Sequence, residues 1–216
     1  MHDFKIPVYI INLKERIDRQ THILNEFKDK PEFEIFLFEA IRDAIGAVGL
    51  WKSITAVVKL AKEKGEDLII ICEDDHQFTE NYNYNQLLKN IERGERFGAN
   101  ILLGGISWFD YMTQVHPNLF WINSFNATQF VIMYSSFFDC ILNATFDAHE
   151  NADFKIAELT ESKYVMFPFV SVQREFGYSD VTSRNSEEGY VNELFIHSEL
   201  KLDHMDTVRK FYNLKF

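Results

Sequence analysis

Residues 69–75 constrain the fold of this chain more than any other segment, because an apolar run stops there at three acidic residues in succession. The run Ile-Ile-Ile-Cys is typical of a strand that is buried on both faces of a sheet. Open α/β sheets bind their ligands beyond the carboxyl ends of such strands. We therefore expect Glu73, Asp74 and Asp75 to lie at the edge of a sheet where a ligand binds.

The three acidic residues can form a metal site if the chain stays extended through them. Side chains alternate along a strand, so Glu73 and Asp75 would then lie on one side and Asp74 on the other. Two neighbouring carboxylates suit a hard cation such as Mn²⁺ or Mg²⁺. The alternative is that these residues are solvated loop or helix-cap residues, which also commonly follow a strand.

The composition indicates a globular protein that does not bind nucleic acid. A length of 216 residues fits one domain, taken as 1–216, and 46% hydrophobic residues can fill its core. The formal charge of -11 argues against a partner with a phosphate backbone, which favours basic patches. It leaves room for a small phosphorylated ligand, since a metal ion can bridge carboxylates to a diphosphate.

Cysteine use and the N-terminus favour a reducing, cytoplasmic location. Cys72 lies in the predicted buried strand and Cys140 is the only other cysteine, so a disulfide framework is not expected. Residues 1–5 lack the pattern of a secretion signal, and no apolar stretch reaches the length of a membrane span. We expect at most peripheral membrane contact. The Asn-Ala-Thr triplets at Asn126 and Asn143 are therefore interpreted as chance matches to the glycosylation pattern.

Hydrophobic periodicity predicts alternating strands and helices. In the first helix, Ile17, Leu24 and Phe27 are expected to share one apolar stripe, and Ser135 or Ser136 is expected to cap a later helix. The alternation in the first 75 residues predicts an α/β fold with a mainly parallel, Rossmann-like central sheet flanked by helices on both faces. The predicted strands are 7–13, 33–38, 68–72, 101–103, 119–122, 129–134 and 164–167. The predicted helices include 84–97, 151–159 and 205–212. Apart from the strand at 119–122, residues 108–125 are expected to be irregular.

Four blocks of sequence, in order, resemble glycosyltransferase family 25, the lipopolysaccharide and collagen galactosyltransferase-like family. Residues 8–19 match its opening strand, which ends in Ile-Asn-Leu and is followed by two arginines. Residues 49–53 correspond to its Gly-x-x-x-Ser-His segment, with Ile54 in place of the His. Residues 71–75 match its apolar-Glu-Asp-Asp motif, and 167–173 with 179–181 resemble its Pro…Gln…Ser-Asp-Ile block.

The resemblance implies a GT-A fold and the transfer of a hexose, with galactose expected, from a UDP-sugar to a saccharide or glycoconjugate hydroxyl. It implies that Glu73 and Asp75 hold Mn²⁺ or Mg²⁺, which would stabilise the charge on the departing diphosphate. The family is classed as inverting, so a carboxylate base is expected. Asp153 falls where the family carries an acidic residue, although it can equally be a carboxylate favoured by the helix dipole; Glu150 is the substitute.

The remaining candidate residues are each weighed against a plain structural role. The candidates for binding the donor are Asn12, Arg16, Arg19, Asp74, Gln173 and Ser179. Each could instead have a structural role, in a turn, as a helix cap, on a solvent-exposed helix face or as a buried amide bonded to the main chain. Asp180 matches a family motif and is a catalytic candidate whose contact (sugar, metal or backbone) is left open. The third metal ligand of GT-A enzymes is frequently a histidine, for which His76, His197 and His204 are candidates. Trp108 and Phe109 are the best placed aromatic platform for a sugar.

A second function class is also compatible with the sequence. A non-catalytic sugar-nucleotide or glycan-binding module would keep the fold without turnover, and Ile54 favours it, whereas a paired metal site argues against it. A metal-dependent phosphohydrolase is disfavoured because there is no Asp-x-Asp-x-Thr-like nucleophile motif or histidine cluster.

Overall fold

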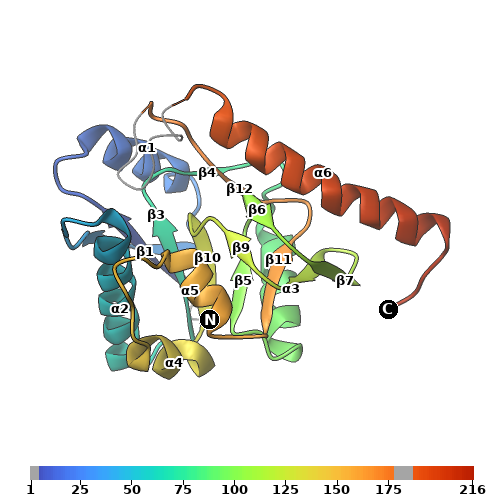
Figure 1. Cartoon of the computed structure of the whole chain (residues 1–216), viewed down its shortest axis with the longest axis horizontal. Coiled ribbons are helices and arrows are strands. Elements are labelled where there is room, and N and C mark those ends of the chain that lie inside the picture. Colours follow the sequence, from blue (N-terminus) through green and yellow to red (C-terminus); the bar gives the residue numbers. More distant parts are fainter. Residues whose placement is uncertain (1–4, 178–186) are drawn as a thin grey trace.

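An eight-stranded sheet runs through the computed structural model, which describes residues 5–177 and 187–216 (Figure 1). Its strand order is β2-β1-β3-β10-β5-β11-β8-β7. Strands β10 and β8 are antiparallel to both of their neighbours, and the other strands share one direction, which confirms the predicted mainly parallel α/β sheet. The strands are β1 Ile6–Asn12, β2 Phe33–Glu39, β3 Leu68–Glu73, β5 Ile101–Leu103, β7 Met112–His116, β8 Leu119–Ile122, β10 Phe130–Tyr134 and β11 Lys163–Met166.

Helices cover both faces of this sheet, and two short ribbons lie near its edge. One ribbon pairs β4 (His76–Phe78) with β12 (Ser171–Gln173), and the other pairs β6 (Trp108–Phe109) with β9 (Phe125–Asn126). Within the described ranges, we find no helix that combines the length and apolar character needed to cross a membrane. The helices are α1 Ile17–Phe27, α2 Gly46–Lys64, α3 Tyr84–Arg96, the 3₁₀ turn η1 Ser135–Phe137, α4 Phe138–Asn143, α5 Ala152–Glu158 and α6 Tyr190–Phe211.

Alternating side chains of β1 and β3 divide the core into two layers. Tyr9, Ile11, Ile69 and Ile71 belong to the layer that contains the buried residues of α2, including Ile54. The intervening residues of both strands belong to the layer of α1 and α3. Burial of one such side chain contributes roughly 1.5–3 kcal/mol, so the two layers fix the register of the central strands. It follows that Glu73, which continues the Ile69–Ile71 series, emerges on the α2 face.

The predicted apolar stripe of α1 is wrong in two of its three residues. Ile17 is 68% exposed and Leu24 is 42% exposed, whereas Phe27 is buried. The buried face of α1 instead carries Arg19 and His22 beside Ile23 and Phe27. The helix is rotated because its inward face meets the acidic turn after β3 as well as the apolar core.

Three further elements differ from expectation. Neither Ser135 nor Ser136 caps α4, because both belong to η1, and the N-cap residue of α4 is Phe137, which makes no side-chain cap hydrogen bond. Helix α6 begins at Tyr190, well before residue 205, and its buried stripe includes the polar Ser198 and Asp206, which hide the apolar periodicity. Residues 108–125 form β6 to β8 and the start of β9, in strands too short for a period-two pattern to show.

The Gly49–Ser53 block anchors the chain after β2 to helix α2. The Ser53 hydroxyl donates to the Gly49 carbonyl at 2.8 Å and accepts from the Ile41 amide at 2.8 Å. A Cβ on Gly49 would lie 2.7 Å from the Ile41 carbonyl oxygen. Glycine is therefore needed here by a close approach of two backbones, which holds the segment around Ile41 against the helix.

We predict that Gly49→Ala destabilises the protein, although alanine is the better helix former. The added methyl must displace the Ile41 backbone, and overpacking of this kind costs about 1–3 kcal/mol. Urea denaturation followed by circular dichroism measures the change. Lys59→Ala, on the exposed face of the same helix, should change stability by less than about 0.5 kcal/mol. A Gly49→Ala protein as stable as the wild type would show that the Ile41 segment does not pack tightly on α2.

Candidate active site

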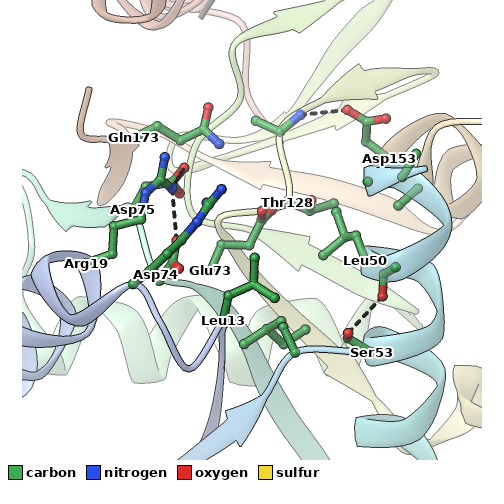
Figure 2. Close-up of a pocket in the computed structure, with 18 of the residues that line it drawn as sticks. Leu13, Arg19, Leu50, Ser53, Glu73, Asp74, Asp75, Thr128, Asp153 and Gln173 are labelled. Carbon is green, nitrogen blue, oxygen red and sulfur yellow. Dashed lines mark hydrogen bonds and ion pairs between the residues drawn. The ribbon is translucent and has the colours of Figure 1, made fainter. Parts of the chain in front are cut away.

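A cavity of about 630 Å³ opens at the carboxyl ends of β1, β2 and β3. This volume is within the usual range for a pocket that binds a small molecule. Its walls come from the start of α1, the chain between β2 and α2, the turns after β3 and β9, the start of α5 and the chain after β12. Figure 2 shows Glu73, Asp74, Asp75, Asp153 and Gln173 around it.

The chain does not stay extended through Glu73, Asp74 and Asp75, because it turns at Asp74 and Asp75 before β4 begins. Glu73 ends β3 on the α2 face, and Asp74 points toward α1, as alternation requires. Asp75 also reaches Arg19 from this turn. Its Oδ2 accepts from Arg19 Nη1 at 3.2 Å, and Asp74 Oδ1 accepts from the same nitrogen at 2.9 Å.

Arg19 holds the acidic turn from the first part of α1. Its side chain is 7% exposed, and its guanidinium lies 4.7 Å from the ring centroid of Phe176. The Arg174 guanidinium lies 5.1 Å from the same centroid and donates to His22 Nδ1 at 3.0 Å. Arg16, the other predicted arginine, precedes α1 and also lines the cavity. Arg174 and Phe176 were missed by the sequence analysis, since only the β4–β12 pairing brings them to α1.

Thr128 is a second residue that the sequence analysis missed. It lies just before β10, and its hydroxyl donates to Glu73 Oε1, at the end of the neighbouring strand β3, at 2.6 Å. Ala127, just before it, has a φ of 104°, a conformation that a residue with a side chain rarely adopts. The Asn-Ala-Thr triplet that begins at Asn126, interpreted above as a chance match to the glycosylation pattern, therefore contains the site residue Thr128. Only the pairing of distant strands could have revealed this.

Asp153 faces the cavity from the first turn of α5, and Glu150 does not line it. Asp153 Oδ2 accepts from the Ala127 amide at 3.2 Å, and Oδ1 accepts from the Phe154 amide at 2.9 Å. Burial raises the pKa of Asp153 above its usual range. Glu150 pairs with Lys155 at 2.8 Å, and this hydrogen bond lowers the pKa of Glu150. Of the two predicted bases, the geometry favours Asp153.

The donor-binding predictions divide into residues inside and outside the cavity. Gln173 lines it at the end of β12 (Figure 2). Asn12 does not line it, because this buried side chain donates to the Leu13 carbonyl at 2.8 Å, as a turn residue would. Asp74 is only 7% exposed and meets Arg19, so its carboxylate is engaged within the protein. Ser179 and Asp180 lie outside the described residues.

The predicted histidine ligands do not line the cavity. His76 is fully buried among aromatic rings, and its Nδ1 lies 2.7 Å from Ser171 Oγ. His197 and His204 are exposed on α6. In residues 5–177 and 187–216, no group of three or more His, Cys, Asp or Glu side chains is arranged to hold a metal ion.

If Glu73 and Asp75 were both ionised, the described groups would not fully neutralise their charge. Burial, with the nearby charge of Asp75, raises the pKa of Glu73 to about 8. Burial also raises the pKa of Asp75 to about 6 against the opposing charge of Arg19. Asp75 Oδ1 is buried without a hydrogen-bond partner among the described residues. A hard divalent cation binds carboxylate oxygens and favours their ionised form, so Glu73 and Asp75 remain suitable as two of its ligands.

Comparisons with known proteins yielded fold neighbours alone. The chain matches no family model and no curated protein, so membership of family 25 stays a prediction. A protein from Bacillus anthracis assigned as a glucose-1-phosphate thymidylyltransferase, solved with sucrose, has 11% identity and a TM-score of 0.49 over 88% of this chain and 75% of its own. A UDP-glucose pyrophosphorylase complexed with UDP-glucose has 9% identity and a TM-score of 0.48 over 89% and 80%. Similarity this distant carries no argument about what the present chain binds.

We predict that the stability of the cation-free wild type falls relative to that of Glu73→Gln as pH rises from 5 to 8. Unfolded Glu73 ionises near its ordinary value of 4.5, whereas the folded group keeps its proton to about pH 8. Between these values the folded state binds more protons, so its stability is lost as pH rises. We expect the difference between the proteins to change by on the order of 1 kcal/mol or more.

Urea denaturation in a chelator at several pH values measures this difference. Asp139→Asn, at an exposed ion pair with Lys62, is the control that should follow the wild type. Parallel pH profiles for Glu73→Gln and the wild type would mean that Glu73 ionises normally in the folded protein.

Proposed function

We propose that this protein is a metal-dependent glycosyltransferase that moves a hexose from a UDP-sugar to the hydroxyl of a saccharide or glycoconjugate, with inversion. The observation that carries the proposal is one cavity with opposed sets of groups. Arg19 and Asp75 lie on one side of the cavity with Glu73 beside them, the buried carboxylate of Asp153 lies on the other side (Figure 2), and Arg16 also lines the cavity. Inversion requires a base and a leaving group on opposite sides of the reacting carbon.

The side of the cavity with Glu73 and Asp75 suits a diphosphate that binds with a cation. Glu73 and Asp75 would hold Mn²⁺ or Mg²⁺, and the ion, when bound, would act as a Lewis acid toward the leaving diphosphate. Arg16 and Arg174 also line the cavity and can attract phosphate oxygens directly. Thr128 fixes the direction of the Glu73 carboxylate through its hydroxyl.

Asp153 is suited to take the acceptor proton because its environment favours the neutral form. Its raised pKa makes it a better base than an exposed aspartate, and it lies where the wall of the cavity is formed by α5. The two amides that it accepts from keep the carboxylate oriented.

A non-catalytic sugar-nucleotide-binding module is the second candidate. Ile54, at the position of the family His, is 1% exposed within the core, so it offers the cavity no polar group. Arg19 also engages Asp75, which a cation must share or displace. This candidate binds the donor and cation without releasing UDP.

We predict that Asp75→Asn abolishes the Mn²⁺-dependent release of UDP from UDP-galactose while the protein remains folded. The amide keeps the size of the side chain but removes the negative charge that the cation needs. Mn²⁺ affinity by calorimetry and UDP release by a coupled assay measure the two effects. Asp43→Asn, another cavity-lining aspartate, should retain Mn²⁺ binding. Normal release by folded Asp75→Asn would remove the metal proposal, and donor binding without release by the wild type would favour the binding module.

We predict that Asp153→Asn keeps donor binding but lowers transfer by about 10²-fold or more, because the amide cannot accept the proton. Its oxygen can still accept from Ala127, so the fold should be preserved. Donor affinity by calorimetry and transfer rate with a saccharide acceptor are compared with those of Glu150→Gln, which lies outside the cavity. A near-normal rate would reject Asp153 as the base.

A further inference from the structure

We propose that Trp108 and Phe154 form a platform for a neutral pyranose of the acceptor, at the rim of the cavity next to Asp153. This inference rests on the proposed function. Both rings are surface groups, with Trp108 41% and Phe154 40% exposed. Their centroids lie 5.9 Å apart and their planes meet at 81°. Two exposed aromatic side chains at right angles offer an apolar face to one side of a sugar ring.

The β6–β9 ribbon fixes Trp108 close to the cavity. Trp108 lies opposite Asn126 in the antiparallel pairing, and Asn126 lines the cavity. Both the amide and the hydroxyl of Ser107 donate to the Asn126 carbonyl, at 3.0 and 3.1 Å. Because β6 is a strand, its next residue points the other way, and Phe109 is 5% exposed in the core. The predicted Trp108–Phe109 platform is therefore wrong in its second residue.

The position of Phe154 is fixed from the other side by α5. Phe154 follows Asp153, whose carboxylate accepts from the Phe154 amide and from the Ala127 amide. Helix α5 lies beside β9, which Figure 1 shows near the centre of the molecule. The platform is thus continuous with the wall that carries the proposed base.

The chemistry of this rim favours a neutral saccharide. A pyranose presents C–H groups on a face and hydroxyl groups at its edge, and it needs an aromatic surface beside hydrogen-bonding groups. Beside the two rings, the cavity wall supplies the amides of Asn126 and Asn151 and the carboxylate of Asp153. The net charge of -11 and the adjoining carboxylate disfavour an anionic occupant.

The test measures saccharide binding without donor or cation, so that it is independent of the proposed chemistry. Lactose, maltose and N-acetyllactosamine are titrated by saturation-transfer NMR and tryptophan fluorescence. We expect at least one to bind the wild type, with affinity about tenfold lower in Trp108→Ala and largely restored in Trp108→Phe. Phe211→Ala, at an exposed aromatic residue at the far end of α6, is the matched control and should bind normally.

The outcomes separate this inference from the proposed function. Unchanged binding by Trp108→Ala, or no binding of any of the three saccharides to the wild type, would overturn the platform. Self-association that is lost in Trp108→Ala, without saccharide binding, would also overturn it and would assign the two rings to a contact between copies. Saccharide binding that depends on Trp108 in a protein that never releases UDP would support the platform and reject the glycosyltransferase.

Discussion

The site depends on the burial of three successive carboxylates at the end of β3. Placing such charges in a low-dielectric interior is unfavourable unless cations or donors face them. Arg19 faces Asp74 and Asp75, and Thr128 faces Glu73. These contacts explain why α1 turns an arginine inward where its sequence would place Ile17 or Leu24. The orientation of the helix thus follows from the charge of the turn.

Much of the fold could be read from local pattern, because the layers follow side-chain alternation. The residues of β1 and β3 are apolar on both faces, so their burial between helices could be predicted, and so could the parallel order of the first strands. The extent of α6 could not, since Ser198 and Asp206 occupy buried positions where their hydrogen bonds satisfy them. Polar residues that are buried through tertiary hydrogen bonds interrupt the apolar periodicity from which a helix is predicted.

The site was predictable where a local pattern or the family resemblance marked its residues. Glu73, Asp74 and Asp75 stood out because they end an apolar run, and Asp153 because of the family resemblance. The turn that sends Asp75 to Arg19 depends on β4 pairing with β12, almost 100 residues later in the chain. Thr128 depends likewise on β10 entering between β3 and β5. Such pairings leave no local signal, so residues that complete a site across strands are the ones that sequence reasoning misses.

The two halves of the cavity are joined through Ala127. Its positive φ costs on the order of 1–2 kcal/mol for a residue with a Cβ, and the surrounding contacts must hold it. The amide of Ala127 donates to Asp153, and the next residue, Thr128, donates to Glu73. One strained turn therefore sets the direction of both the proposed base and a proposed metal ligand. A change in the position of α5 would reach Glu73 by this route, which makes the geometry of the proposed acceptor side and that of the proposed donor side interdependent.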